Sequence, residues 1–295
     1  MLSLLGRVQI DTLLKVSIKL LSAYFLKGSV TSTLSVRRNS ILNITGNTIL
    51  ITGGNSGIGR GLAEAFHKLG NTVIIAGRRQ QTLDEVTEAN PGINSVVLDV
   101  DDANSVRAMV AQVIREHPAL NVLINNAGIM RTESVHALPE MLDAAEETIT
   151  TNLLGPIRLT NAVLRHFHEQ AQHDPQSRAA VLNVTSGLAF VPRADTPTYS
   201  ATKAALHSYT ESLRALLRGT TTQVIELIPP LVATELTPGQ SANPRALPLS
   251  EYISETIHLL QTQPDASEIV IERVKFQRHA EREQRYEAAF QLINS

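Results

Sequence analysis

From Ile44 onward, short apolar runs alternate with longer segments in which apolar residues recur every three or four positions. Short apolar runs indicate buried strands, the longer period indicates amphipathic helices, and their alternation is typical of β-α-β units around a parallel sheet. The predicted strands lie at residues 48–52, 72–76, 95–98, 122–124, 180–184, 223–228 and 268–271. We therefore predict a single α/β domain over residues 44–295, with a doubly wound, mostly parallel seven-stranded sheet and helices on both faces.

The first 43 residues depart from this pattern. Residues 1–46 carry six Lys or Arg side chains and one Asp, and they are rich in Leu, Ser and Thr. No run there reaches the about 18–20 uninterrupted apolar residues that a membrane span requires. The segment is a basic N-terminal extension with three open interpretations: a mitochondrial-type transit peptide, a helix lying on a surface, or an extension outside the functional fold.

Composition narrows the function. With 43% hydrophobic and 18% charged residues, the chain has an ordinary globular composition. Its net charge of −2 argues against a nucleic-acid partner, which would require a basic surface. The chain has no Cys, which excludes disulfides, thiolate nucleophiles, Cys-bound zinc and iron–sulfur clusters. We expect a cytoplasmic location, while organellar targeting by the basic extension stays open.

A glycine-rich turn follows the first predicted strand and leads into a predicted helix. Its sequence from residue 52 to residue 59 is Thr-Gly-Gly-Asn-Ser-Gly-Ile-Gly. Glycines let backbone N–H groups and the positive end of a helix dipole approach a pyrophosphate with no Cβ in the way. This order of strand, turn and helix is that of a Rossmann-type dinucleotide site, although a plain tight connection could also use such glycines. The cofactor-binding residues predicted in the turn are Gly53, Asn55, Ser56, Gly57, Ile58 and Gly59.

The end of the second predicted strand indicates which dinucleotide binds. A free ribose 2′-hydroxyl calls for an Asp or Glu acceptor there, but the chain has Arg78 and Arg79. A guanidinium can hold a 2′-phosphate through two charge-assisted hydrogen bonds. We therefore predict NADP(H) in preference to NAD(H), with Arg78 as the main contact. The alternative is that the two arginines are a solvated pair at a helix start.

Four more segments follow in order along the chain. They are Asn-Asn-Ala-Gly at 125–128, Thr-Asn at 151–152, Asn-Val-Thr-Ser-Gly at 183–187 and Tyr-Ser-Ala-Thr-Lys at 199–203. Together with the glycine turn they resemble the short-chain dehydrogenase/reductase family over about residues 47–234, and the chain looks similar to its DltE-like sub-group of bacterial oxidoreductases. Pro229 and Pro230 stand where the family usually has Pro-Gly, a departure that concerns the shape of the loop and not the chemistry.

The candidate catalytic residues combine a hydroxyl, a phenol and an amine. Tyr199 and Lys203 are four positions apart, which places them on one face of a helix. Because a nearby ammonium favours a phenolate, we expect a lowered pKa for Tyr199 and proton exchange near neutral pH. Ser186 follows a predicted strand, where its hydroxyl could polarise a carbonyl oxygen. The resemblance assigns catalysis to these three residues and implies that Asn152 supports a water linking Lys203 to solvent.

The resemblance also implies cofactor contacts outside the glycine turn. Asn126, Ala127 and Gly128 follow the fourth predicted strand, where small or amide residues let the backbone pass close to a ribose and adenine. Asp99 ends the third strand and would accept a hydrogen bond from the adenine amino group, with helix capping as its alternative role. The remaining predicted cofactor contacts are Tyr199, Lys203 and Thr234.

We predict no metal site. His166, His168 and His173 gather near one helix end but lack the spacing and the carboxylate of a zinc-binding helix, so we interpret them as part of a solvated face.

The predicted function is an NADP(H)-dependent oxidoreductase that moves a hydride between nicotinamide and a carbonyl or alcohol carbon, with Tyr199 as general acid and base. The alternative is a catalytically silent NADP(H)-binding regulatory or scaffold protein on the same fold. The expected partner is a small molecule held beside a Pro-rich loop at 229–248, and the resemblance suggests a homodimer or homotetramer built on helices near 139–168 and 198–217. The other candidate pocket residues are Ile129, Met130, Leu188, Phe190, Val191 and Pro192, with Arg131 and Arg193 nearby. The alternative for the apolar ones is ordinary packing under a lid.

Overall fold

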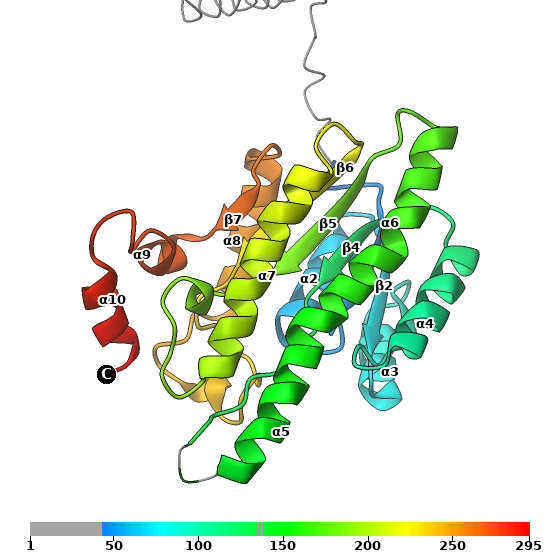
Figure 1. Cartoon of the computed structure of the whole chain (residues 1–295). Coiled ribbons are helices and arrows are strands. Elements are labelled where there is room, and N and C mark those ends of the chain that lie inside the picture. The colour runs from blue at the N-terminus through cyan, green and yellow to red at the C-terminus, as the bar shows by residue number, and fades with distance from the viewer. Residues whose placement is uncertain (1–42, 135, 137) are drawn as a thin grey trace, which may run out of the picture. The chain divides into compact units, whose positions relative to one another are not determined.

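One parallel sheet contains all seven predicted strands, in the order β3-β2-β1-β4-β5-β6-β7 (Figure 1). The computed structural model describes residues 43–134, 136 and 138–295, so the predictions for residues 1–42 concern residues outside the described part. Every strand pairing is parallel. The strands are β1 Thr48–Thr52, β2 Thr72–Gly77, β3 Asn94–Val97, β4 Leu120–Asn125, β5 Ala179–Val184, β6 Thr222–Ile228 and β7 Glu268–Val270.

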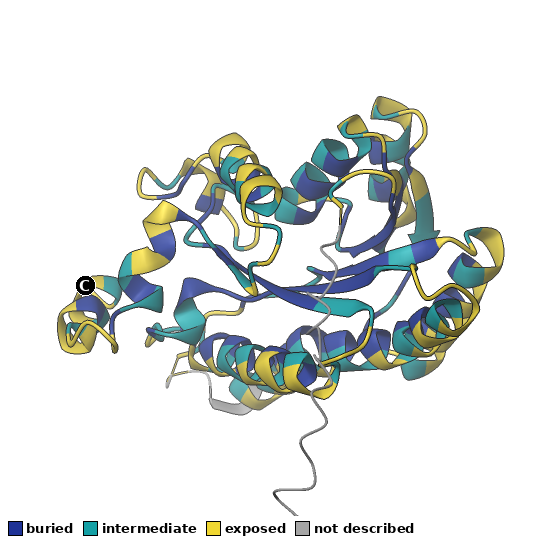
Figure 2. Cartoon of the chain, turned by 90° about the horizontal axis from the view of Figure 1, so that it is seen from above, coloured by how far each residue is buried: buried dark blue, intermediate teal, exposed yellow. Residues whose placement is uncertain are grey.

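The apolar runs form strands because both faces of the sheet are covered. Ile49 and Ile51 of β1 belong to one hydrophobic cluster, while Leu50 between them belongs to the cluster on the opposite face. This explains why the central strands are continuous apolar runs and do not alternate with polar residues. Viewed from above, the buried strands lie between two layers of helices whose outer surfaces are exposed (Figure 2).

Three helices cover each face of the sheet. Leu62, Leu83 and Ile253 bring α2, α3 and α8 into the first cluster, whereas Leu159 and Leu213 bring α6 and α7, together with α4, into the second. The main helices are α2 Gly57–Lys68, α3 Gln80–Ala89, α4 Ala103–Glu116, α5 Leu138–Ile149, α6 Gly155–His173, α7 Pro197–Leu216 and α8 Leu249–Thr262, followed by the short α9 Lys275–Arg278 and α10 Tyr286–Ile293. No helix in the described ranges is long and apolar enough to cross a membrane.

The strand order places a switch point beside β1. The chain runs outward from β1 to β2 and β3, then returns to place β4 on the other side of β1. In open α/β sheets, ligands bind at such a point, outside the carboxyl ends of the strands. The segments that follow β1, β4 and β5 therefore converge on one crevice.

The loop at 229–248 is closed by contacts between its ends. The Leu247 N–H donates to the Leu231 carbonyl (2.9 Å), and the Ala233 N–H donates to the Leu247 carbonyl (2.8 Å). Inside the loop, Gln240 Nε2 donates to the Val232 carbonyl at 2.9 Å. The loop is thus a defined element that can form a wall.

Candidate active site

The glycine turn forms a cradle at the start of α2. A methyl group on Gly59 would overlap the carbonyl oxygen of Gly53, so the turn closes only with glycine at that position. Gly57 has φ of +51°, a conformation that glycine adopts readily, and its Cα faces the Thr234 methyl. The Ser56 side chain makes no cap hydrogen bond, which leaves the first N–H groups of α2 available to an anion. The cradle therefore fits the pyrophosphate of a dinucleotide.

Thr52, which the sequence analysis did not single out, organises the neighbouring turn. Its buried hydroxyl accepts hydrogen bonds from the N–H groups of Asn126 (3.0 Å) and Ala127 (3.1 Å). The Asn126 amide in turn donates to the Thr52 carbonyl at 2.9 Å. The ends of β1 and β4 are thus fixed together. Sequence alone could have suggested Thr52 only through its place at a strand end, because its partners lie 74 and 75 positions away.

The two arginines after β2 are exposed. Within the described residues, neither guanidinium has a hydrogen bond or ion pair. Nearby, Asn55 lies against Gly77, where a Cβ would come within 2.7 Å of Asn55 Oδ1, and Asn55 Nδ2 donates to Thr82 Oγ1 (2.7 Å). Among the described residues, Arg78 is therefore a cation without a partner at the end of β2, where the sequence provides no acidic acceptor.

Asp99 does not cap the helix that follows β3. Its carboxylate accepts a hydrogen bond from the Asp101 N–H (3.0 Å), whereas Asp102 is the N-cap of α4 and accepts from the Asn104 N–H (2.8 Å). Helix capping, the alternative role for Asp99, is therefore wrong. Asp99 is half-buried, and its role toward adenine stays a prediction.

Ser186, Tyr199 and Lys203 meet beside the carboxyl end of β5. Tyr199 and Lys203 lie on α7 with side chains that are 6% and 4% exposed, and Ser186, 7% exposed, follows β5. The side chains of Ser186 and Tyr199 lie close together, and Ser186 Oγ also accepts a hydrogen bond from the Leu188 N–H at 3.1 Å. The Lys203 ammonium lies over the Tyr199 ring, 5.6 Å from its centroid, and donates to the Val184 carbonyl at 2.9 Å. Tyr199 and Lys203 thus share one face of α7, as their four-residue spacing predicted.

The expected lowering of the Tyr199 pKa is wrong for this structure. Burial raises the pKa of Tyr199 to about 12, and the hydrogen bond with Ser186 opposes this rise only in part. Burial also lowers the pKa of Lys203 to about 8. The reason is geometric, because the ammonium faces the ring and a backbone carbonyl, where it does little for a phenolate oxygen. The phenol is therefore protonated at neutral pH.

Asn152 sits on a π-helical turn, Thr150–Leu154, between α5 and α6. Such turns occur often at functional sites. Its side chain, 1% exposed, accepts from the Ile129 N–H and donates to the Ile129 carbonyl, both at 2.8 Å. The Asn152 side chain thereby fixes the segment that follows β4. In the same segment, a Cβ on Gly128 would lie 3.2 Å from Asn152 Oδ1 and 3.7 Å from Lys203 Nζ. Gly128 therefore lies close to both Asn152 and Lys203.

A cavity of about 560 Å³ opens beside Ser186 and Tyr199. Of the expected pocket residues, Met130, Leu188 and Arg193 line it, as does the loop at 229–248 through several residues. The other walls come from segments that the sequence did not indicate, including Arg273, Phe276 and the chain from 292 to 295.

Several expected pocket residues lie elsewhere. Val191 is fully buried in a small cluster, Phe190 packs on the main core, and Arg131 pairs with Glu147 at 3.2 Å. Ile129 and Pro192 are likewise not among the residues that line the cavity. The apolar run after Ser186 therefore contributes to packing more than to the pocket.

One of the three clustered histidines also differs from expectation. His168 and His173 are exposed, but His166 is half-buried beside Phe167, with ring centroids 6.2 Å apart, and its Nε2 is buried. His166 therefore packs against the protein and is not part of a solvated face.

Comparisons with known proteins agree with this geometry. The family model described as short chain dehydrogenase matches residues 47–245. The uncharacterized oxidoreductase DltE of Bacillus subtilis (strain 168) is 38% identical over 258 residues, which cover 86% of this chain and 99% of that protein. The NADP-dependent 3-hydroxy acid dehydrogenase of Schizosaccharomyces pombe is 34% identical over 199 residues, 65% of this chain and 74% of that protein. A solved short chain dehydrogenase from Burkholderia cenocepacia J2315 in complex with NADP has the same fold, with a TM-score of 0.70, 23% identity, and coverage of 86% of this chain and 100% of that one.

Proposed function

This chain belongs to the short-chain dehydrogenase family, an oxidoreductase family that uses NAD(P), and from this premise we propose that it is an NADP(H)-dependent reductase of carbonyl compounds. The observation that carries the proposal is the placement of Ser186 and Tyr199 together in the wall of one cavity, next to the buried Lys203. When bound, the nicotinamide supplies the hydride. The protein positions the carbonyl, polarises its oxygen and delivers a proton.

The proton comes from the Tyr199 phenol. Its raised pKa keeps the phenol protonated at neutral pH, which is the form that a carbonyl reduction requires. The alkoxide that forms on hydride arrival is a much stronger base than a phenolate, so transfer of the phenolic proton to it is favourable. Ser186 donates a hydrogen bond to the same oxygen. The protonated phenol therefore suits carbonyl reduction, which is the proposed direction.

NADP(H) is the proposed cofactor, with NAD(H) as the weaker ligand. The support is the exposed Arg78 at the end of β2, which has no partner among the described residues and is suited to a 2′-phosphate. The glycine cradle at the start of α2 would hold the pyrophosphate. Gly128 and Lys203 would lie along the nicotinamide ribose.

The cavity favours a substrate with an apolar body and an anionic group. Its lining includes Leu231, Phe276 and Leu292, three arginines and a single acidic side chain, Asp195. Arg193 pairs with Asp195 at 2.6 Å, and Arg273 donates to the Arg245 carbonyl. The Arg245 guanidinium itself has no hydrogen bond or ion pair in the described part of the chain, so it is the cation available to a substrate anion. We expect Arg245→Gln to raise KM about tenfold for a keto acid and to leave KM for its methyl ester unchanged. Equal changes for both substrates would contradict an anionic subsite.

A homodimer or homotetramer is the proposed assembly. Single large apolar side chains are exposed in the segments expected to mediate it, namely Leu142 on α5 (63% exposed), Leu154 on the π-helical turn (39%) and Leu216 on α7 (76%). Analytical ultracentrifugation tests this, since a monomer at micromolar concentration would contradict it. The cytoplasmic location stays a prediction.

The test of the function is NADPH oxidation by the full chain with a panel of aldehydes, ketones and keto acids. We expect turnover, and we expect Tyr199→Phe to lower kcat at least about 10²-fold because general acid catalysis is removed. Unchanged turnover in Tyr199→Phe would refute the role of the phenol. Tight NADPH binding with no turnover across the panel would instead support the alternative of a regulatory or scaffold protein.

A further inference from the structure

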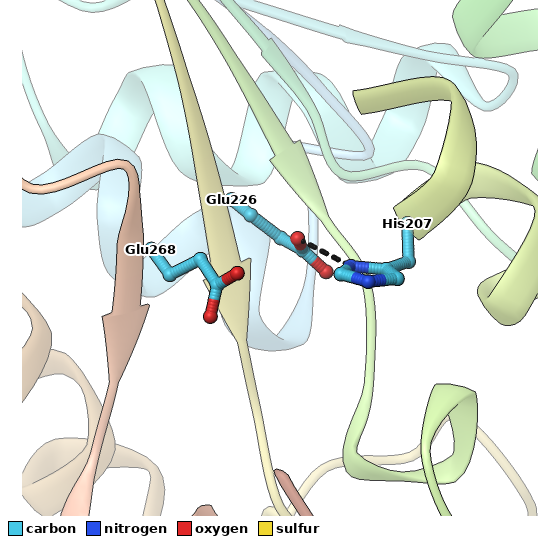
Figure 3. A group of neighbouring side chains, drawn as sticks. All are labelled: His207, Glu226 and Glu268. Carbon is cyan, nitrogen blue, oxygen red and sulfur yellow. Dashed lines mark hydrogen bonds and ion pairs between the residues drawn. The ribbon is translucent and has the colours of Figure 1, made fainter. Parts of the chain in front are cut away.

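A buried carboxylate links the two elements that carry the catalytic residues. Glu226 on β6 is 0% exposed. Its Oε1 accepts a hydrogen bond from Thr185 Oγ1 at 2.7 Å. Its Oε2 accepts one from His207 Nδ1 at 2.8 Å (Figure 3). Neither the proton chemistry nor the cofactor cradle described above uses this group, and burying a carboxylate is costly unless it is fully hydrogen-bonded.

The partners of Glu226 stand next to the catalytic residues in the chain. Thr185 immediately precedes Ser186, and His207 lies one helical turn beyond Lys203 on α7. One carboxylate thus joins the end of β5 to α7. The Thr185 N–H also donates to the Leu227 carbonyl at 2.9 Å, so β6 supports the segment before Ser186 at two points.

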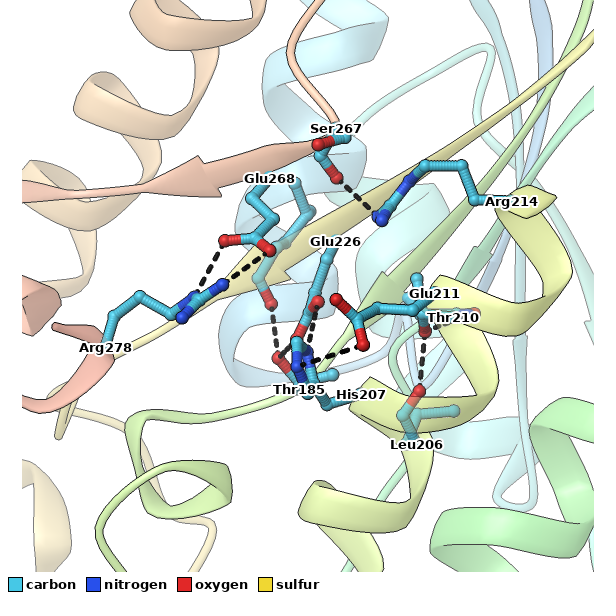
Figure 4. A network of polar contacts seen from close by, with 12 residues as sticks. Thr185, Leu206, His207, Thr210, Glu211, Arg214, Glu226, Ser267, Glu268 and Arg278 are labelled. Carbon is cyan, nitrogen blue, oxygen red and sulfur yellow. Dashed lines mark hydrogen bonds and ion pairs between the residues drawn. The ribbon is translucent and has the colours of Figure 1, made fainter. Parts of the chain in front are cut away.

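The carboxylates of Glu226 and Glu268 are neutralised by side chains of the protein and do not require a metal ion. Ligand atoms of His207, Glu226 and Glu268 lie within 4.8 Å of one another, a spacing that could hold a metal ion. However, Glu268 accepts two hydrogen bonds from Arg278, at 2.8 and 2.9 Å, and both Glu226 oxygens already have partners (Figure 4). The hydrogen bond to Glu226 raises the pKa of His207 and so favours the cationic imidazolium, which cannot bind a metal through Nδ1.

We propose that Glu226 is a positioning residue for the reductase reaction, and that it holds Ser186 in line with Tyr199 and Lys203 through Thr185 and His207. The inference rests on the proposed function, since it concerns the geometry of the same site. Misplacing a catalytic group by about 1 Å can lower a rate about 10²-fold. Glu226 touches neither substrate nor cofactor, so its removal acts on kcat and not on cofactor affinity.

Two matched pairs of variants test this in the full chain. Glu226→Gln keeps the size of the side chain but turns an amide N–H₂ toward a donor, and Glu268→Gln makes the same change on the neighbouring strand without touching Thr185. We expect Glu226→Gln to lower kcat 10- to 100-fold with the NADPH Kd unchanged, and Glu268→Gln to keep the wild-type kcat. Thr185→Val should lower kcat by a similar factor. Thr185→Ser keeps the hydroxyl and should have the wild-type kcat.

A readout that does not depend on activity separates this inference from the proposed function. By hydrogen exchange, the amides at 187–188 and 203–207 should exchange faster in Glu226→Gln than in the wild type, and Glu268→Gln should leave them unchanged. If the wild type reduces no carbonyl, the proposed function fails and the exchange result still decides the positioning role. Equal exchange in the two Gln variants, or equal kcat in Thr185→Val and Thr185→Ser, would overturn it. Stoichiometric Zn²⁺ binding that is lost in Glu226→Gln would also overturn it, in favour of a metal site.

Discussion

Replacing Arg78 should change the cofactor preference more than any other single surface substitution. The guanidinium is exposed, stands directly after Gly77 at the end of β2, and is not committed to another described residue. Hydrogen bonds to charged groups contribute about 1.5–3 kcal/mol. Because each 1.4 kcal/mol is about tenfold in Kd, Arg78→Gln should weaken NADPH binding by roughly 10- to 150-fold.

The assay is a fluorescence titration of the wild type and Arg78→Gln with NADPH and with NADH. NADH lacks the 2′-phosphate, so its Kd should change less than about twofold, and the NADPH effect should shrink at high salt because the contact is exposed. Arg79→Gln serves as the matched control and should have the smaller effect. Equal weakening of NADPH and NADH by Arg78→Gln would refute the assignment, because that result would indicate a damaged turn and not a lost phosphate contact.

Two further predictions concern buried groups of the site. Burial lowers the pKa of Lys203 to about 8 in the folded state, from 10.5 for a solvated Lys. Between these two pH values the unfolded chain binds more protons than the folded one, so the free energy of unfolding rises with pH. Measured by urea unfolding, the free energy of unfolding of the wild type should therefore rise by up to about 3 kcal/mol between these pH values relative to that of Lys203→Met. If the two proteins lost or gained stability in parallel with pH, the lowered pKa would be contradicted. Thr52→Val removes the acceptor of two N–H groups and should lower the free energy of unfolding by about 2 kcal/mol. The control Thr48→Val, at the other end of β1, should lower it much less.

The sheet could be predicted from the sequence because its strands are buried on both faces. A continuous apolar run such as residues 73–76 has no competing explanation once helical segments flank it. The strand ends then place residues 53, 126 and 186 at one edge. The four-residue spacing of Tyr199 and Lys203 also fixed their common helix face in advance.

The other features of the site depend on contacts between residues that are far apart in the sequence, and these could not be predicted. The link from Thr185 to Glu226 spans 41 positions and joins two strands, and a polar residue within the apolar run of β6 carries no signal of its partner. The pKa of Tyr199 was misjudged because spacing predicts proximity to Lys203 but not how deeply the phenol is buried. The cavity walls from 273 to 295 likewise come from segments with no motif.

The central claim is that Ser186, Tyr199 and Lys203 surround the reacting end of one bound dinucleotide. The most direct test is a crystal structure of the full chain with NADP⁺ and a keto acid. We expect the pyrophosphate to bind at the start of α2 and the 2′-phosphate to bind at Arg78. The substrate carbonyl oxygen should lie within hydrogen-bond distance of Ser186 Oγ and Tyr199 Oη. A nicotinamide bound away from these two hydroxyls would contradict it.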